Sequence, residues 1–422
     1  MEEIKKTFLH KWHADNGGNL VGFGDYEMPL WYSSVKKEHL VVLTNAGMFD
    51  TSHMAVVMAK GPDAFDLIQL CFTRDLNACI GKDKLPIAAG RCVYGAYLDE
   101  NGYSIDDAII YKITDEEYMI VANAGMGGAI AEHMEASRGD KQVNITDLTD
   151  NLGKFDIQGP MSVKIMRKVL KDPEKIFDKM VYFSFKGHFD PSSPFAQQVQ
   201  LKDGTPLLLS RSGYTGEVGF EIFIAPEATV KAWEMIMEAG LEFGCLPCGL
   251  ASRDSLRTGS LLPLSHQDIG HWTYLNHPWS FALPYTADGS GFTKDFIGAK
   301  ALAAARDIAD HTIAFAGNDL RKIDAHTAKV LDADGNEIGT VLTCATDIAI
   351  SRVNGKIYCI VSPDKPENFK AKGLCCGYVK VKTRLGVGDT IILQDDKRKL
   401  KVIVAEDIRP DRTARKPLKI FM

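Results

Sequence analysis

Four short segments carry the side chains that acid–base chemistry and ligand recognition require. The first is GYSIDDAII at 102–110, which places Asp106 and Asp107 in an otherwise apolar strand. Because adjacent residues of a strand point to opposite faces, we expect one carboxylate to face the core or a cleft and the other to face outward. A carboxylate held against apolar groups indicates a proton, a cation or an amine nearby. Carboxylates that serve only turns or salt bridges are the alternative.

The second and third segments offer hydrogen-bonding groups at strand ends. Asn123 ends a predicted strand before a Gly-rich turn, so its amide offers a donor and an acceptor there, although a plain turn Asn is the alternative. In SRSGYTGEVGFEIF, at 210–223, the loop lacks Lys and contains Glu217, which excludes a phosphate-binding loop. Glu221 on the following strand suits a ligand edge that donates N–H groups. A hairpin with solvated acids is the alternative.

The fourth segment, PCGLASRDSLR at 247–257, predicts the start of a helix. Arg253 and Arg257 lie four residues apart on one helical face, and arginine recognises planar carboxylates with two parallel hydrogen bonds. A surface Arg–Asp pair is the alternative. Together the four segments describe a site for a ligand with a donor edge, a reactive amine and an acidic tail.

Two similar units position these residues. KGPDAFDLI at 60–68 and QGPMSVKIM at 158–166 each predict a strand, a Gly-Pro turn and an amphipathic helix. The similarity indicates an internal repeat of α+β halves, and chance use of a common turn is an equally open interpretation. Further strands and one helix are predicted at 91–98, 108–113, 118–122, 207–210 and 219–224, and at 227–240.

From about residue 310 onward, short strands alternate with frequent turns. This pattern predicts a small all-β domain, either a barrel or a sandwich. The strands are expected at 312–315, 328–331, 339–343, 357–361, 377–381, 390–393 and 401–405.

Composition limits the classes of partner. The net charge is −6 and no basic run occurs, which argues against nucleic acid or an anionic membrane. No apolar run approaches the roughly 18 residues of a membrane helix, and MEEIKKTFLHKWHAD lacks the apolar region of a signal peptide. The nine cysteines are an odd number in a long chain, so we expect reduced thiols and a cytoplasmic location.

With these segments in place, the chain resembles the folate-dependent aminomethyltransferase family, which comprises the T-protein of the glycine cleavage system and its relatives. Tetrahydrofolate has the donor edge, the amine and the acidic tail described above. The collinear matches are EMPLWY at 27–32, MFDTSHM at 48–54, GYSIDDAIIY at 102–111, NA at 123–124, QGP at 158–160, SRSGYTGEVGFE at 210–221, GLASRDSLR at 249–257 and KDFIGAKAL at 294–302.

The resemblance implies an α+β fold with three domains in a cloverleaf around a central folate channel and a C-terminal β-barrel. The implied domains are 1–52 together with 155–285, then 53–154, then 286–422. Asp107 matches the catalytic aspartate, and Glu221 matches the residue that binds the pterin edge. The other positions that match or suit the folate pocket are Met54, Tyr94, Asn123, Tyr182, Tyr214 and Arg253. No metal is implied.

The chain departs from the T-protein pattern where the one-carbon donor should approach. LSHQDI at 264–269 replaces a YGQ-like segment, and NHPWSF follows at 276–281. We therefore predict donor contacts from Ser265, His266 and Trp279.

Three hypotheses follow from the resemblance. The first is transfer of an aminomethyl-derived methylene from a lipoylated carrier protein to tetrahydrofolate, with release of ammonia. The second is a demethylase that takes a methyl group from a small O-, S- or N-methyl compound and gives 5-methyltetrahydrofolate. The third is a folate-binding assembly or repair factor without such activity.

Overall fold

The structure is a computed structural model that describes residues 4–422. Its contacts divide the chain into two compact units. Unit 1 comprises residues 1–96, 106–253 and 413–422, and unit 2 comprises residues 97–105 and 254–412. Each unit is described by itself.

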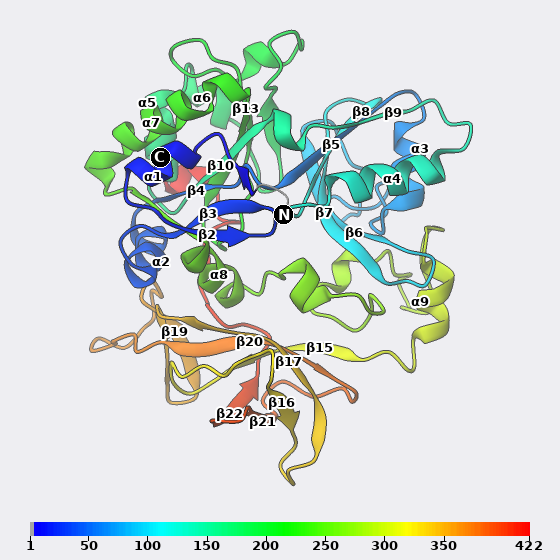
Figure 1. Ribbon diagram of the computed structural model, residues 1–422, viewed down its shortest axis with the longest axis vertical. Helices are drawn as coiled ribbons and strands as arrows, with labels where there is room; N and C mark the ends of the chain where they lie inside the picture. The colour runs from blue at the N-terminus through cyan, green and yellow to red at the C-terminus, as the bar shows by residue number, and fades with distance from the viewer. Residues whose placement is uncertain (1–3) are drawn as a thin grey trace. The chain divides into compact units, whose positions relative to one another are not determined.

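Unit 1 contains a six-stranded sheet in the order β11-β12-β13-β10-β4-β14 (Figure 1). Strand β10 is antiparallel to both β13 and β4, and β14 is parallel to β4. The strands are β4 (Gly47–Asp50), β10 (Gly153–Gln158), β11 (Phe185–Gly187), β12 (Leu208–Ser210), β13 (Gly219–Ile224) and β14 (Leu246–Pro247).

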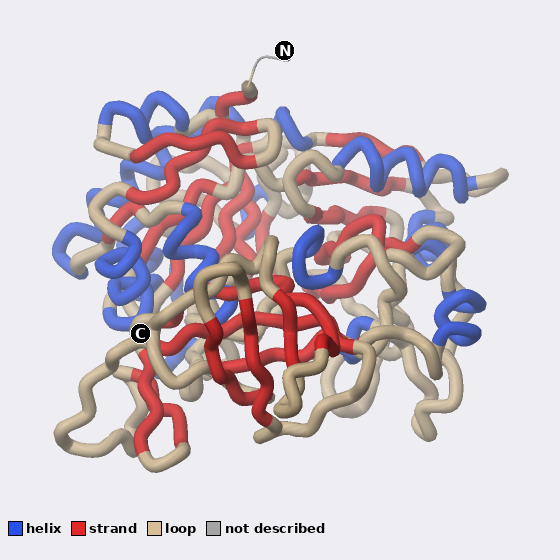
Figure 2. Tube along the Cα trace, turned by 60° about the horizontal axis from the view of Figure 1, so that its bottom comes forward, coloured by secondary structure: helices blue, strands red, loops and turns tan. Residues whose placement is uncertain are grey.

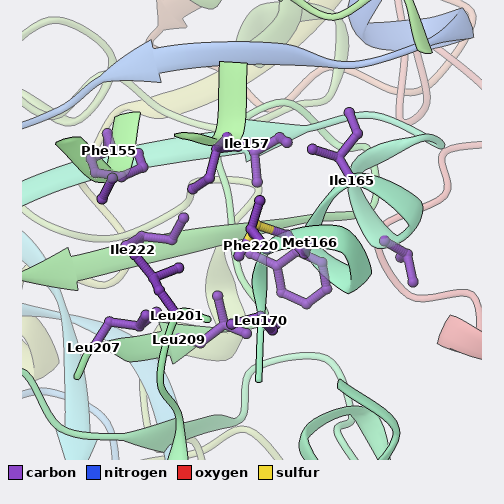
Figure 3. Close-up of a cluster of buried hydrophobic side chains, with 14 of the residues drawn as sticks. Phe155, Ile157, Ile165, Met166, Leu170, Leu201, Leu207, Leu209, Phe220 and Ile222 are labelled. Carbon is purple, nitrogen blue, oxygen red and sulfur yellow. The ribbon is translucent and has the colours of Figure 1, made fainter. Parts of the chain in front are cut away.

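Helices cover one face of this sheet, because alternate residues of its central strands are apolar. Phe155 and Ile157 of β10 lie on the same side as Phe220 of β13, and they belong to the same buried cluster as Ile165 and Met166 of α5 (Figure 3). Helix α5 packs against α7, as Figure 1 shows. The helices of this part of the chain are α1 (His10–Asp15), α2 (Val35–Thr44), α5 (Ser162–Val169), α6 (Pro173–Phe177) and α7 (Thr229–Gly240).

A second, five-stranded sheet in the order β6-β7-β8-β5-β9 is formed almost wholly by unit 1. Helix α4 packs on β5 and β9 and also contacts α3 (Figure 1). The elements are β5 (Ala55–Lys60), β6 (Arg91–Leu98), β7 (Ser104–Lys112), β8 (Glu117–Ala122), β9 (Asn144–Asp147), α3 (Ala64–Cys71) and α4 (Gly127–Arg138). A small sheet in the order β1-β3-β2 completes the unit, with β1 (Lys5–Lys6), β2 (Asn19–Phe23) and β3 (Tyr26–Trp31).

Both predicted strand–turn–helix units are confirmed, as β5 followed by α3 and as β10 followed by α5. Their glycines, Gly61 with φ 148° and Gly159 with φ 120°, adopt a backbone conformation that side chains disfavour. A Cβ would lie 2.1 Å from the Gln142 carbonyl oxygen at the first turn and 2.6 Å from the Asn45 carbonyl oxygen at the second. The two turns therefore require glycine for the same physical reasons.

Unit 2 contains a closed barrel in the order β15-β20-β17-β16-β21-β22, which confirms the predicted C-terminal barrel (Figure 2, strands in red). Its interior includes Phe315, Val379, Leu393 and Val402. The strand predicted at 357–361 instead pairs with β18 in a separate hairpin, outside the barrel. The strands are β15 (His311–Ala316), β16 (Lys329–Leu331), β17 (Glu337–Asp347), β18 (Ile350–Val353), β19 (Lys356–Cys359), β20 (Leu374–Val381), β21 (Thr390–Gln394) and β22 (Lys399–Val404).

Two further helices are α8 (Leu250–Gly259), which begins in unit 1, and α9 (Ala299–Ala305). No helix among residues 4–422 combines the length and the apolar character of a membrane span. The fold is thus mixed α+β with a closed barrel. The division into three domains at the stated residues, and their cloverleaf arrangement around a channel, stay predictions.

Candidate functional site

The second face of the six-stranded sheet carries charged side chains, although it is as buried as the apolar face. Lys154 and Asp156 alternate with Phe155 and Ile157 along β10, and Asp156 is the cross-strand partner of Glu221 on β13. The exposed fractions are 1% for Lys154, 0% for Asp156 and 6% for Glu221. Burial without pairing would be costly for each charge, so their partners decide what the face can do.

The charges are paired in a row, here called the charged row, in the order Glu221, Lys154, Asp156 and Arg253. Lys154 Nζ lies 2.9 Å from Glu221 Oε1 and 3.6 Å from Asp156 Oδ1. Arg253 Nη1 donates to Asp156 Oδ2 over 2.8 Å. Burial acts to raise the pKa of Asp156, but the positive charges of Lys154 and Arg253 outweigh it and lower that pKa.

The other oxygen of Glu221 is held by hydroxyl groups. Tyr111 donates to Oε2 over 3.3 Å, and the Ser212 hydroxyl also donates to it. Tyr111 belongs to β7, so this contact connects the five-stranded sheet to the six-stranded sheet within unit 1. Burial, followed by the charge of Glu221, raises the pKa of Tyr111 well above its ordinary value, so the phenol keeps its proton and remains a donor.

Arg253 closes the other end of the charged row against aromatic rings. Its guanidinium carbon lies 5.1 Å from the centre of the Tyr214 ring and 5.7 Å from that of Phe49. The predicted ligand residues Glu221, Arg253 and Tyr214 are thus connected through contacts on one side of the sheet.

A second cluster forms at the end of β8. Tyr94 donates to Asp107 Oδ2 over 2.7 Å, and Asn123 Nδ2 donates to Asp107 Oδ1 over 2.7 Å. Asn123 also donates to Asp106 twice, from Nδ2 over 2.8 Å and from the backbone N–H over 2.9 Å. Asp107, Tyr94 and Asn123, predicted from separate segments, therefore lie in one hydrogen-bonded group.

The expectation that one of the two aspartates faces outward is wrong. Asp106 is 0% exposed and Asp107 is 9% exposed, and both bind Asn123. The reason is that β8 ends at Ala122, which pairs with Ala108, so Asn123 lies where the ladder stops. Beyond that last pair, its backbone N–H is available to Asp106 and its side-chain amide reaches both carboxylates.

These contacts fix the orientation of the Asn123 amide. Because Nδ2 donates to two carboxylates, Oδ1 is the atom left for a ligand. No residue of the described chain, 4–422, donates a hydrogen bond to this oxygen. An acceptor thus lies directly beside the Asp107 carboxylate, where a ligand N–H group would find a partner.

The two clusters share strand β7. Asp107 and Tyr111 are four residues apart on the same face of β7, which corresponds to about 13 Å of strand.

The remaining predicted pocket residues are half-buried in unit 1. Met54 follows a turn closed by its N–H to the Thr51 carbonyl at 3.0 Å, and Tyr182 lies 5.4 Å below the Arg415 guanidinium. Burial raises the pKa of Tyr182 to about 12.

Lys154, Asp156 and Tyr111 were not among the residues predicted for the site. The signal for the first two is present in KFDIQ at 154–158, because polar and apolar residues alternate there along the strand. Tyr111 carried no local signal, since its role depends on the approach of a distant strand.

The predicted donor residues belong to unit 2. Ser265 and His266 begin the π-helix Ser265–Ile269, which Asp268 anchors by accepting hydrogen bonds from Arg257 and Thr343. Trp279 is 3% exposed and donates to the Leu261 carbonyl over 2.9 Å. For Ser265, His266 and Trp279, contact with a donor stays a prediction. No group of three or more His, Cys, Asp or Glu side chains within 4–422 is arranged to hold a metal.

His53, which precedes Met54, predicts a pH dependence of stability. It is 3% exposed, its Nδ1 has no hydrogen-bond partner within the described residues, and burial lowers its pKa to about 4 despite the opposing charge of Asp50. The neutral form is therefore favoured in the fold, so its contribution to stability is complete above about pH 6.5 and is lost as the pH falls toward 4. In urea titrations, the unfolding free energy of the wild type should fall between about pH 6.5 and pH 4. In His53→Gln this fall should be smaller by on the order of 2–3 kcal/mol. An unchanged pH dependence would contradict this assignment.

The chain is similar in sequence to one protein family and to several proteins of known type. Residues 9–275 match the family model described as the GCVT N-terminal domain. An aminomethyltransferase of Bacillus mycoides is 36% identical over 269 residues, which are 64% of this chain and 67% of that protein. An aminomethyltransferase of Symbiobacterium thermophilum is 35% identical over 309 residues, which are 72% of this chain and 76% of that protein.

A solved structure has a similar fold. It is the glycine cleavage system aminomethyltransferase T of Bartonella henselae, with a TM-score of 0.74 and 23% identity. The match covers 95% of this chain and 97% of that protein.

Proposed function

The chain belongs to the aminomethyltransferase family of the GCVT N-terminal domain, and we propose from this premise that it transfers a one-carbon unit to tetrahydrofolate. The observation that carries the proposal is the Asp107 carboxylate, held by Tyr94 and Asn123 beside the open Asn123 Oδ1. Matching residue types without this convergence would support only membership of the family.

The described residues fit the proposed acceptor. A pterin edge presents N–H donors, and both Glu221, within β13, and Asn123 Oδ1, directly after β8, are acceptors held by hydrogen bonds. Tyr94, Tyr182, Tyr214 and Met54 would form its apolar and aromatic walls. We propose no metal, because tetrahydrofolate itself supplies a nucleophilic amine, N5, which accepts the carbon.

Asp107 has the catalytic role in this proposal. Two hydrogen bonds, one on each carboxylate oxygen, hold it in a single orientation. A fixed carboxylate can accept the proton that is released as the new N–C bond forms, and it stabilises positive charge on the incoming carbon. Asp106 does not replace it, because Asp106 is 0% exposed whereas Asp107 is 9% exposed, so Asp107 is the carboxylate that a ligand can reach.

The donor that we propose is an aminomethyl group on the lipoyl sulfur of a carrier protein. Its methylene passes to tetrahydrofolate, and ammonia and the reduced, dihydrolipoyl carrier are the other products. The test is to mix the pure protein with tetrahydrofolate and each candidate donor and to identify the folate product by mass. 5,10-Methylenetetrahydrofolate formed only with the aminomethylated lipoyl protein supports the proposal. 5-Methyltetrahydrofolate formed from a small O-, S- or N-methyl compound would make the protein a demethylase. Folate binding without turnover of any donor would favour an assembly or repair factor.

Replacing Glu221 by Ala should weaken tetrahydrofolate binding by about 1–3 kcal/mol, because a donor edge of the ligand would remain unpaired in a buried site. This corresponds to roughly a 5- to 150-fold rise in Kd, measured by calorimetry without oxygen. Glu227→Ala, at an exposed position six residues further along the chain, is the control and should leave Kd unchanged. Equal affinities of the Glu221 variant and the wild type would show that the pterin edge is held elsewhere.

A further inference from the structure

The charged row places two ionised residues where apolar residues would serve folding as well. Lys154 and Asp156 occupy interior positions of β10, and the opposite face of the same strand is apolar. A buried ion pair is often no more stabilising than apolar residues of similar volume, because desolvation of the charges offsets their attraction. The stability of the sheet alone therefore does not explain why charged residues occupy these two positions.

The residues at the two ends of the charged row provide an explanation. Glu221 and Arg253 are both predicted to contact the ligand, and the charges of Lys154 and Asp156 lie between them in alternating sign. Lys154 is 1% exposed and its ammonium donates to Glu221 over 2.9 Å and to Thr51 over 3.1 Å, so it is fully engaged away from solvent. Neither interior residue is placed to touch a ligand itself.

The acceptor capacity of Glu221 shows how Lys154 would act. Oε2 already accepts from Tyr111 and Ser212, and Oε1 accepts from Lys154. A carboxylate has about four acceptor sites when ionised, so one remains for a ligand N–H group. If Glu221 took up a proton, it would exchange an acceptor site for a donor, and a ligand donor edge would lose its partner.

We propose that Lys154 and Asp156 are positioning residues: Lys154 keeps Glu221 an ionised acceptor for the ligand, and Asp156 holds Arg253 in place against Tyr214. The inference rests on the proposed function, since the ligand in question is tetrahydrofolate. It adds two residues that act through others to the set that contacts the ligand.

The first test is the pH profile of tetrahydrofolate binding, measured by calorimetry without oxygen on the full chain. In Lys154→Met, the buried Glu221 loses its counter-ion and should bind a proton, which weakens ligand binding. We expect Kd to rise at least about tenfold over wild type near pH 6, with the difference shrinking toward pH 8.5 as the carboxyl group ionises. A merely structural role would raise Kd equally at all pH values, and that result would overturn the assignment of Lys154.

The double variant Lys154→Met/Glu221→Gln identifies the titrating group and contains no unpaired buried charge at these two positions. Its binding should be weaker than wild type but should not show the pH dependence of the single variant. If the double variant kept the pH dependence of tetrahydrofolate binding, the titrating group would not be Glu221, and the proposal would be overturned. Lys112→Met is the matched control, because Lys112 is a buried lysine whose partners are the Ile87 carbonyl and Asp115. It should leave the pH profile of binding unchanged.

A second readout does not require folate. In Lys154→Met the folded state favours protonated Glu221, so the unfolding free energy should fall as the pH rises from about 5 to 7, relative to the double variant. Absence of this difference would overturn the role of Lys154 even if binding were normal. If the wild type fails to bind tetrahydrofolate while the stability difference is present, then the proposed function fails but the control of Glu221 by Lys154 stands.

Asp156→Asn tests the other half of the row. This change keeps the volume but removes the charge that pairs with Arg253. Tetrahydrofolate binding should weaken severalfold without the pH dependence of Lys154→Met, and wild-type affinity would overturn the role of Asp156.

Discussion

Replacing Asp107 by Asn is expected to lower kcat for one-carbon transfer by about 10²- to 10⁴-fold, the usual contribution of a positioned acid–base group. Asn has nearly the same shape and retains one side-chain oxygen, so one of the two hydrogen bonds from Tyr94 and Asn123 can persist. The proton acceptor and the negative charge are lost. Binding of tetrahydrofolate should survive, because Glu221 of β13 contacts β7 at Tyr111, four residues further along that strand than Asp107.

The measurement combines single-turnover formation of the folate product with calorimetric Kd. A low rate with a Kd close to wild type supports the catalytic role. Asp115→Asn is the control, since Asp115 is an exposed aspartate beyond the end of β7, and its rate should be that of the wild type. Unchanged turnover of Asp107→Asn would remove Asp107 from the mechanism.

The second large effect concerns stability. Arg409→Met should destabilise the fold by about 3–5 kcal/mol, because it leaves the charge of Asp347 buried without its partner. Both side chains are 0% exposed, and Arg409 Nη1 lies 2.9 Å from Asp347 Oδ2. Arg409 also donates to the Ser260 hydroxyl and the Leu256 carbonyl, so one substitution removes several hydrogen bonds within unit 2.

Urea unfolding of the variants would test this expectation. The double variant Arg409→Met/Asp347→Leu should recover much of the loss, because no unpaired charge remains. Arg412→Met removes a partly exposed pair with Asp407 and should change the unfolding free energy by less than about 1 kcal/mol. Equal effects at Arg409 and Arg412 would show that burial of the pair is not decisive.

Local patterns were enough to predict many elements of this chain. The strand, Gly-Pro turn and helix at 60–68 and 158–166 were predicted correctly, because periodicity and the conformational freedom of glycine act within a few residues. The strands of the barrel were predicted on the same basis. The strand predicted at 357–361 is present as β19, but it pairs with β18 outside the barrel, since a strand segment does not show which strand it will pair with.

The site was predictable only in part. Asp107, Asn123 and Tyr94 were each identified, but their mutual hydrogen bonds were not, and one of Asp106 and Asp107 was expected to face outward although both are buried. The position at which β8 stops pairing with β7 decides that Asn123 can reach both aspartates. That position depends on the register of two strands, which no single segment encodes.

Local patterns along the chain predict the secondary structure of most segments, the family resemblance and the residue types of the candidate site. Those features follow from local periodicity, from turn chemistry and from side chains that are individually suited to a ligand. That Lys154 and Asp156 connect Glu221 to Arg253, and that Tyr111 joins the two sheets at Glu221, follows from how the folded strands lie together. The physical reason is that a buried charge is defined by its partners, and the strands that bring those partners together are far apart along the chain.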